Sequence, residues 1–286
     1  MELQWFPGHM AKTRRLLKDN IKLVDVVIEL VDARLPMSSR NPEIDAIVGF
    51  RPRIVVLNKS DMADKNTNKK WIAYFNSKNI PAVEISSLSG QGIKNIDREI
   101  EKVLAEKFKK DEARGIKRHA VRMMVAGIPN VGKSSFINKI SGRAAAKTGN
   151  RPGITQTKQW IRIDGKYELL DTPGILWPKF EDKEAAKRIA FTGGIKDEIM
   201  DIEELAYYLV EYLKENYPGN LRERYNLEDG FESMDSYELL ELIGRKRGCI
   251  ISGGRVDTLR TSNLILDDFR SAKIGNISLE TPEMYK

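Results

Sequence analysis

The segment GIPNVGKS (Gly127 to Ser134) lies between an apolar strand pattern, MMVAG, and a helical pattern, SSFINKI. It matches the consensus G-x-x-x-x-G-K-[S/T] in the strand, loop and helix context that this consensus needs. Its glycines let successive backbone N–H groups turn toward a phosphate, Lys133 adds a positive charge, and the Ser134 hydroxyl can ligate Mg²⁺. The sequence therefore predicts a phosphate-binding loop within an α/β domain.

Strand and helix patterns alternate over the first 177 residues. Helical patterns lie at residues 64–79, 93–110 and 133–141. Apolar, β-branched runs that predict strands lie at residues 23–32, 53–58, 81–86, 121–127, 158–163 and 167–171. This alternation predicts a mostly parallel, doubly wound sheet covered on both faces. The Asp164-Gly165 turn joins the last two runs, so one antiparallel edge is expected.

The strand pattern stops after Pro178. An amphipathic helix begins behind the predicted N-cap Asp201, where Glu204 can close a capping box. Further helices are expected at about 182–192, 235–247 and 253–270, with a break at Pro218-Gly219. We therefore predict an α/β domain over residues 1–177 and an all-helical domain over residues 178–286.

A base-reading pattern, NKSD (Asn58 to Asp61), begins 69 residues before the phosphate loop. Asp61 can accept two hydrogen bonds from guanine, Asn58 can approach the other edge of the base, and the Lys59 stem can cover the ring. Other bases would leave buried polar groups unpaired. The segment SSLSGQG (Ser86 to Gly92) can direct backbone N–H groups at guanine O6. These features predict GTP and GDP as ligands.

The pattern DTPG (Asp171 to Gly174) follows the last predicted strand. Asp171 can hold Mg²⁺ through a water, and the Gly174 N–H can meet the γ-phosphate. Thr155, in a loop bearing glycine and proline between the two phosphate motifs, has the hydroxyl that can close over Mg²⁺ and the γ-phosphate.

The guanine motif precedes the phosphate motif, whereas GTP-binding proteins normally have the opposite order. The sheet permits this, because every ligand loop leaves the carboxyl end of a strand and domain termini can be joined and reopened elsewhere. We therefore predict a P-loop GTPase fold that is circularly permuted. The segment after DTPG then runs directly into the helical domain.

This motif order, preceded by DAR (Asp32 to Arg34) and by WFPGHMAK at the start of the chain, resembles the circularly permuted GTPases of ribosome assembly. The resemblance is greatest to the bacterial ribosome biogenesis GTPase A family. It implies GTP hydrolysis coupled to late maturation of the large ribosomal subunit.

Ile175 stands where many GTPases have a glutamine that orients the attacking water, and it cannot do so. His9 is the internal candidate, and the family resemblance points to the same residue; the alternative is a surface or stacking histidine. His119 is expected to be solvent-exposed. The expected catalytic residues are thus His9, Lys133 and Thr155.

The resemblance also implies a K⁺ site at Asn130, near the α- and β-phosphates; the alternative is an ordinary loop asparagine. The expected Mg²⁺ ligands are Ser134, Thr155 and Asp171. The expected nucleotide contacts are Asn58, Lys59, Asp61, Ser86, Ser87, Leu88, Gly127, Asn130, Val131, Gly132, Lys133, Ser134, Ser135, Thr155 and Gly174.

The charge is unevenly distributed. Residues 1–177 carry 32 Lys and Arg against 19 Asp and Glu, and residues 178–286 carry 16 against 22. The basic front half favours a polyanionic partner. Within the acidic second half, basic residues that can contact rRNA phosphates, or that merely complement helix dipoles, are Arg245, Lys246, Arg247, Arg255, Arg260, Arg270 and Lys273.

We expect a GTPase that binds a precursor of the large ribosomal subunit in its GTP state, hydrolyses slowly alone and faster on that particle, and leaves after hydrolysis. The alternative is a GTP-dependent signalling or binding module that acts on a protein partner without RNA.

The expected cofactors are GTP or GDP and Mg²⁺, with K⁺ as a further candidate. The expected partners are the precursor and its rRNA, with no DNA and no membrane. A cytoplasmic protein is expected, because Cys249 is the only cysteine and no apolar run reaches the roughly 18 residues of a membrane span. A monomer is expected as well.

Overall fold

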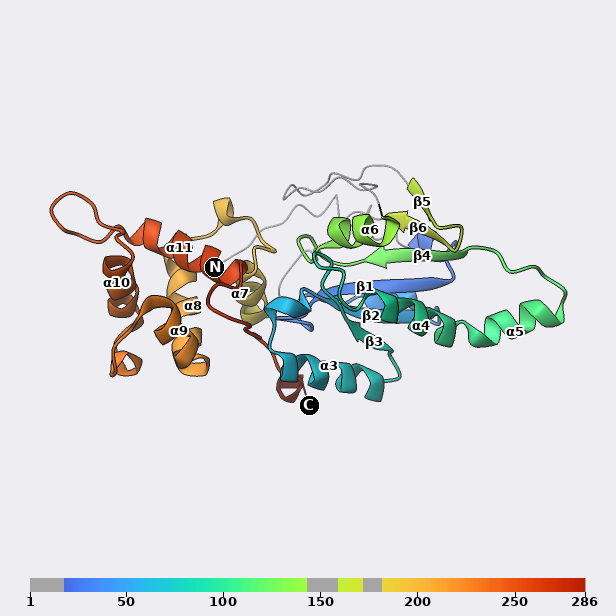
Figure 1. Cartoon of the computed structure of the whole chain (residues 1–286), viewed down its shortest axis with the longest axis horizontal. Coiled ribbons are helices and arrows are strands. Elements are labelled where there is room, and N and C mark those ends of the chain that lie inside the picture. Colours follow the sequence, from blue (N-terminus) through green and yellow to red (C-terminus); the bar gives the residue numbers. More distant parts are fainter. Residues whose placement is uncertain (1–17, 143–158, 172–181, 286) are drawn as a thin grey trace. The chain divides into compact units, whose positions relative to one another are not determined.

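The computed structural model describes residues 18–142, 159–171 and 182–285. The chain divides into two compact units (Figure 1). The first contains Met1–Glu181 together with Ser278–Lys286, and the second contains Asp182–Ile277. Within the described ranges, no helix is both long and apolar enough to span a bilayer.

The first unit is built on a six-stranded sheet with the order β3-β2-β1-β4-β6-β5. All neighbours pair in parallel except β5 and β6. The strands are β1 (Val26–Asp32), β2 (Arg53–Asn58), β3 (Ala82–Glu84), β4 (Val121–Ala126), β5 (Gln159–Ile163) and β6 (Tyr167–Asp171). The predicted parallel sheet with one antiparallel edge is confirmed. At that edge residues 164–166 connect the two strands, and Asp164 and Gly165 both adopt positive φ, 47° and 65°, as the central residues of a type I′ turn do.

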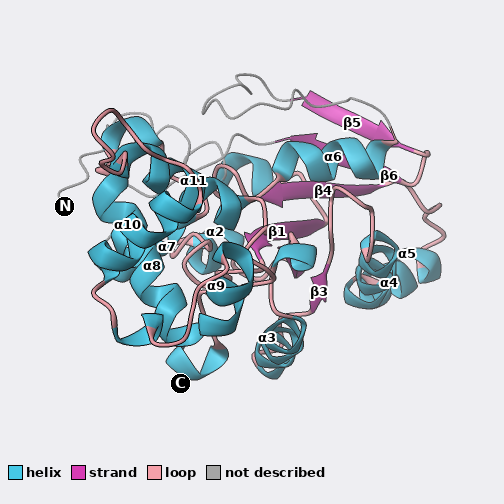
Figure 2. Cartoon of the chain, turned by 60° about the vertical axis from the view of Figure 1, so that its left-hand side comes forward, coloured by secondary structure: helices cyan, strands magenta, loops and turns pink. Residues whose placement is uncertain are grey.

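Helices cover the sheet (Figure 2). Every residue of β1 is buried. One apolar cluster joins α2 to β1, β4 and β6, and another joins α3 to β1, β2 and β3. The helices of this unit are α2 (Ile44–Val48), α3 (Lys65–Ser77), α4 (Ile93–Val103), α5 (Ala105–Ala113) and α6 (Lys133–Ser141). The single helix expected at 93–110 is interrupted at Leu104, so it forms α4 and α5.

The second unit is helical. Its α-helices are α7 (Lys183–Phe191), α8 (Ile202–Asn216), α9 (Pro218–Tyr225), α10 (Ser236–Lys246) and α11 (Thr258–Arg270). The Asp201 side chain accepts hydrogen bonds from the backbone N–H groups of Glu203 and Glu204, which confirms the predicted cap of α8. The break expected at Pro218-Gly219 is instead the start of α9. Proline fits there because the first helical residue needs no N–H donor.

The C-terminal residues differ from the predicted domain division. We expected the second domain to extend to residue 286, but Ser278–Lys286 groups with the first unit. The Leu279 N–H donates to the carbonyl of Arg34 at 2.6 Å, and the Trp71 indole N–H donates to the carbonyl of Glu280 at 3.2 Å. The chain therefore passes between the units twice, before Asp182 and after Ile277.

Candidate functional site

Three of the predicted nucleotide loops leave the same edge of the sheet. The phosphate loop follows β4, NKSD follows β2, and SSLSG follows β3. Because these strands are parallel within one sheet, their carboxyl ends share an edge, which is where α/β proteins bind ligands. Asp171 is the last residue of β6, which pairs in parallel with β4, so its backbone ends at this edge as well.

The phosphate loop connects Ala126 to α6. The Lys133 ammonium donates hydrogen bonds to the carbonyls of Gly127, at 2.9 Å, and Ile128, at 2.8 Å, so it lies over its own loop. Gly132 caps α6 with a φ of 94°. The amide N–H groups at the start of a helix and a nearby ammonium together attract a phosphate.

Both glycines of the phosphate motif allow other segments to approach closely. A Cβ at Gly127 would lie 2.5 Å from the carbonyl oxygen of Leu30 in β1. A Cβ at Gly132 would lie 2.3 Å from Nδ2 of Asn58. The second contact is the important one, because it brings the guanine motif against the phosphate motif.

Asn58 joins three loops. Its Nδ2 donates to the carbonyl of Val131 at 2.7 Å, and its Oδ1 accepts from the backbone N–H and the hydroxyl of Ser87, at 3.0 and 2.8 Å. The residue is buried. Both polar atoms of its amide contact protein. The expected approach of Asn58 to the edge of guanine stays a prediction, because an amide nitrogen carries two N–H donors and Val131 accepts from one of them. Asn58 therefore acts as a brace between NKSD, SSLSG and the phosphate loop.

Lys59 makes a second connection between the two halves of the site. It adopts a left-handed backbone conformation, with φ of 59°. Its ammonium donates to the carbonyl of Asn130 at 2.7 Å and lies 2.9 Å from a carboxylate oxygen of Asp32. The Lys59 stem thus runs from the base-reading turn to the phosphate loop, which is the path required of a side chain that covers a bound base.

Asp32 and Arg34 support Lys59. The Arg34 guanidinium makes two hydrogen bonds to the Asp32 carboxylate, at 3.0 and 2.8 Å, and both residues are buried. Burial tends to raise the pKa of Asp32, but Arg34 and Lys59 outweigh it and hold that pKa well below its usual value. Burial lowers the pKa of Lys59, and the Asp32 charge offsets only part of this effect. From the sequence, DAR was expected only as part of the family resemblance. Its position at the end of a strand beside β2 was the signal that could have placed it in the site.

The remaining base-reading residues lie on exposed turns. Asp61 is exposed in the 3₁₀ turn Ser60–Met62. Leu88 is 71% exposed on the loop that Asn58 holds through Ser87. The backbone of Ser86 closes that loop by accepting from the Gly90 N–H at 2.8 Å. These positions leave the side chains of Asp61 and Leu88 accessible to a ligand, whereas Ser86 and Ser87 are buried.

Some predicted residues lie outside the described part of the chain: His9, Thr155 and Gly174. His119 is exposed, as expected. Among the described residues, no group of three or more His, Cys, Asp or Glu side chains can hold a metal ion. At the end of the phosphate loop, the Ser134 hydroxyl offers an oxygen ligand for a metal ion. It fits Mg²⁺, which is commonly bound by few protein oxygens together with phosphate oxygens and water.

The contact between Gly132 and Asn58 gives a specific prediction. Gly132→Ala places a methyl group where the Asn58 amide lies, so that amide must give up its hydrogen bonds to the flanking loops. GDP affinity should fall by roughly tenfold or more, given about 1–3 kcal/mol for a buried polar group that loses its partners. Titration with a fluorescent GDP analogue measures this. Gly142→Ala is the matched control. It has a φ of 64° but no atom within 4 Å of the added Cβ, so it should leave affinity unchanged. Equal affinities for the two variants would contradict the contact's role.

Comparison with known proteins identifies the family. A family described as 50S ribosome-binding GTPase matches residues 122–232. Ribosome biogenesis GTPase A of Bacillus cereus is 51% identical over 285 residues, covering 100% of this chain and 96% of the relative. The Thermotoga maritima protein of the same name is 31% identical over 281 residues, covering 98% and 95%.

Solved structures agree with this result. The GDP-bound structure of YlqF from T. maritima has a TM-score of 0.67 and 27% identity, and it covers 94% of this chain and 100% of that one. The GNP-bound structure has a TM-score of 0.65 and 26% identity, covering 95% and 99%. With its guanine loops ahead of its phosphate loop on a single sheet edge, the chain belongs to the ribosome biogenesis GTPase A family and has the circularly permuted GTPase fold.

Proposed function

We propose that this ribosome-assembly GTPase binds a precursor of the large ribosomal subunit in its GTP state and leaves the particle after hydrolysis, within the cytoplasm. The observation that carries the proposal is the junction of the guanine and phosphate loops at Asn58 and Lys59. The name of the family that matches residues 122–232, 50S ribosome-binding GTPase, supports the choice of particle.

In the proposed site, Asp61 reads guanine, the Lys59 stem covers the ring and the SSLSG backbone meets O6. The phosphate loop, from Gly127 to Ser135, holds the phosphates. Bound Mg²⁺ would neutralise the charge that develops on the phosphates, with Ser134, Thr155 and Asp171 as its proposed ligands. Asn130 is the proposed K⁺ ligand.

Hydrolysis requires a group that positions water, and Ile175 cannot serve. We assign this role to His9. In this proposal the free chain turns over slowly because a ribosomal particle is needed to hold His9 in place. Catalysis then comes mainly from two effects: His9 orients the attacking water, and the positive charge of Lys133 stabilises the phosphates.

The proposed RNA-binding surface lies on the second unit. Among its basic residues, Arg270 is engaged internally: it makes two contacts of 2.7 Å with Asp197 and donates to two backbone carbonyls. Arg247, Arg255 and Arg260 are exposed and make no ion pair with a described residue. We therefore withdraw Arg270 from the expected phosphate contacts and assign them to these three arginines.

The loop between α10 and α11 (Figure 1) carries Arg247 and Arg255, and Arg260 lies in the first turn of α11. An isolated bridge between Ile250 and Val256 closes the loop, and the Ile251 N–H donates to the Arg255 carbonyl at 2.9 Å. Ile250 and Ile251 are 40% and 43% exposed. Exposed arginines suit a nucleic acid, because phosphates pair with arginine and unstacked bases stack on guanidinium planes.

Co-sedimentation with large-subunit precursors tests the proposal. Binding should be present with a non-hydrolysable GTP analogue, weaker with GDP, and should fall steeply as salt rises. Replacing Arg247, Arg255 and Arg260 with alanine should weaken binding and reduce its salt dependence. Nucleotide-independent association, or none, would instead favour a GTP-dependent module that acts on a protein partner.

Base recognition is tested by Asp61→Asn. The amide cannot accept from both guanine donors, so GDP affinity should fall by about 10²–10⁴-fold, as expected for losing hydrogen bonds to a charged group. Affinity for xanthosine diphosphate should rise, because xanthine offers a carbonyl in place of the amino group. Competition titration measures both affinities. An unchanged preference would show that NKSD does not read the base.

The role of His9 is tested by His9→Ala. Turnover of GTP should fall by roughly 10²-fold or more while GTP affinity stays the same, because the side chain is needed only for the reacting water. Single-turnover hydrolysis and nucleotide titration separate these quantities. His119→Ala, at the exposed second histidine, is the control and should turn over normally. A full rate for His9→Ala would remove His9 from the mechanism.

A further inference from the structure

The end of the chain forms a segment, Ser278–Tyr285, that we call the C-terminal strap. It follows the helical unit directly, yet it packs on the GTPase unit, where its 3₁₀ turn (Pro282–Tyr285) lies beside α3 (Figure 1). Ser278, Leu279 and Glu280 are all buried, with Leu279 and Glu280 at 0% exposure. Residues this deeply buried outside a helix or strand need specific contacts that satisfy their polar groups.

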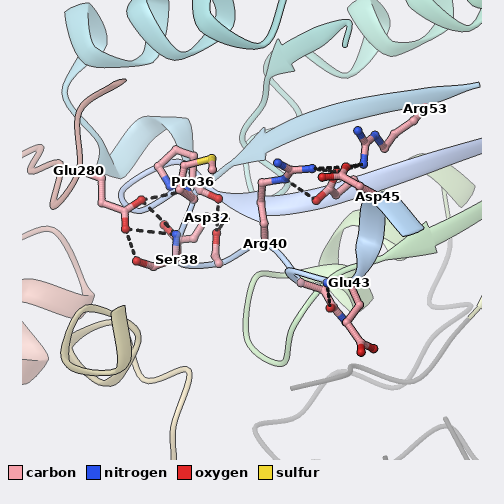
Figure 3. A network of polar contacts seen from close by, with 12 residues as sticks. Asp32, Pro36, Ser38, Arg40, Glu43, Asp45, Arg53 and Glu280 are labelled. Atoms are coloured by element: carbon pink, nitrogen blue, oxygen red, sulfur yellow. Dashed lines mark hydrogen bonds and ion pairs between the residues drawn. The ribbon is translucent and has the colours of Figure 1, made fainter. Parts of the chain in front are cut away.

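Glu280 is the main anchor of the strap. Its carboxylate accepts hydrogen bonds from the backbone N–H of Met37 at 2.9 Å, the backbone N–H of Ser38 at 3.2 Å and the Ser38 hydroxyl (Figure 3). The Tyr285 hydroxyl also donates to it, at 2.9 Å. Successive N–H groups at a turn form a concavity suited to an anion. Glu280 fills the concavity of the loop that begins with DAR.

The other anchors lie on both sides of the base-reading turn. On one side the Leu279 N–H donates to the Arg34 carbonyl. On the other side the Asp64 N–H donates to the Ser278 hydroxyl at 3.1 Å, and Asp64 caps α3 immediately after NKSD. The strap therefore fixes the two segments that flank the Lys59 side chain and the Asp61 turn.

A continuous set of contacts leads from the strap to the nucleotide loops. The strap holds the backbone of Arg34 and the loop behind it, Arg34 holds the Asp32 carboxylate, and Asp32 holds the Lys59 ammonium. Lys59 in turn contacts the phosphate loop at Asn130. A shift of the DAR loop would therefore move the partner that orients Lys59.

We propose that the C-terminal strap sets the affinity of the site for guanine nucleotides, with Glu280 as a positioning residue that acts through the DAR loop and Lys59. This inference rests on the proposed guanine site. Coupling between two sites is reciprocal, so a docked strap favours bound nucleotide and bound nucleotide favours a docked strap by the same factor. Because Ser278 directly follows the helical unit, a conformational change in that unit can alter the guanine loops through the strap. This route is separate from the chain segment that follows DTPG.

Glu280→Gln tests the inference. The amide keeps the size of the side chain but cannot accept every N–H and O–H donor that now surrounds the carboxylate. The affinity for a fluorescent GDP analogue should fall by at least about fivefold, the lower end of typical couplings. The KM for GTP should rise while kcat stays the same, because the proposed catalytic groups are untouched. Glu283→Gln is the matched control. Glu283 belongs to the same strap but is exposed and pairs with the exposed Lys70 at 3.3 Å, so affinity should not change.

A strap that only stabilises the fold would behave differently. Glu280→Gln would then lower the melting temperature without changing GDP affinity or the KM, and that result would overturn the inference. If Glu280→Gln binds GDP with wild-type affinity while Asp61→Asn switches its preference to xanthine, the proposed guanine site stands and only the inference about the strap fails. A wild-type chain that does not bind guanine nucleotides would overturn the proposed function itself.

Hydrogen exchange of the wild-type chain provides a test without any substitution. Saturating GDP should slow exchange of the backbone amides in residues 278–285 by roughly fivefold or more, the reciprocal of the affinity effect. The peptide that covers α10, in the helical unit, should exchange at the same rate with and without GDP. Equal exchange of the strap in both conditions would overturn the inference.

Discussion

The site depends on one buried amide. Asn58 contacts Val131 through its nitrogen and Ser87 through its oxygen, so a single side chain sets the spacing between loops that follow three different strands. A buried amide left without partners costs about 1–3 kcal/mol, so the three loops are held together by the requirement that its hydrogen bonds be made. Gly132 enforces the same arrangement sterically, since any larger residue would occupy the space of the amide. These contacts do not depend on the order of the loops along the chain, so the permuted connectivity leaves the site intact.

The sheet order explains how the two halves meet. β2 and β3 carry the guanine loops, β4 and β6 carry the phosphate motifs, and β1 lies between the two pairs. Asp32 is the last residue of β1 and is paired in register with Asn58 at the end of β2. The junction between the halves is therefore a strand end, and it bears the carboxylate that orients Lys59. A sheet with another order would separate Asp32 from one of its partners.

The sequence predicted the features that local pattern and backbone geometry determine. The six strands, the Asp164-Gly165 hairpin and the Asp201 cap were of this kind, because their signals lie within a few residues of the feature.

The start of α9 was missed because proline both breaks helices and begins them, and the choice depends on what precedes it. The role of Asn58 could not be predicted either, since a motif does not reveal whether an amide bonds to ligand or to protein. The strap was missed for a related reason: Glu280 and Met37 are 243 residues apart, and no periodic pattern marks either of them.

The buried charges at the junction are better explained by positioning than by stability. Removing a charged group from water costs several kcal/mol even in real proteins, and apolar residues of similar volume often stabilise a fold equally well. Asp32 and Arg34 are nonetheless both buried at the end of the central strand, and Lys59 extends to them across the guanine turn. An apolar cluster could close this junction, but it could not hold an ammonium at a defined point between the two loops. The DAR loop that carries Arg34 must itself be kept in place, and the buried Glu280 carboxylate does so by accepting hydrogen bonds from the backbone N–H groups of Met37 and Ser38.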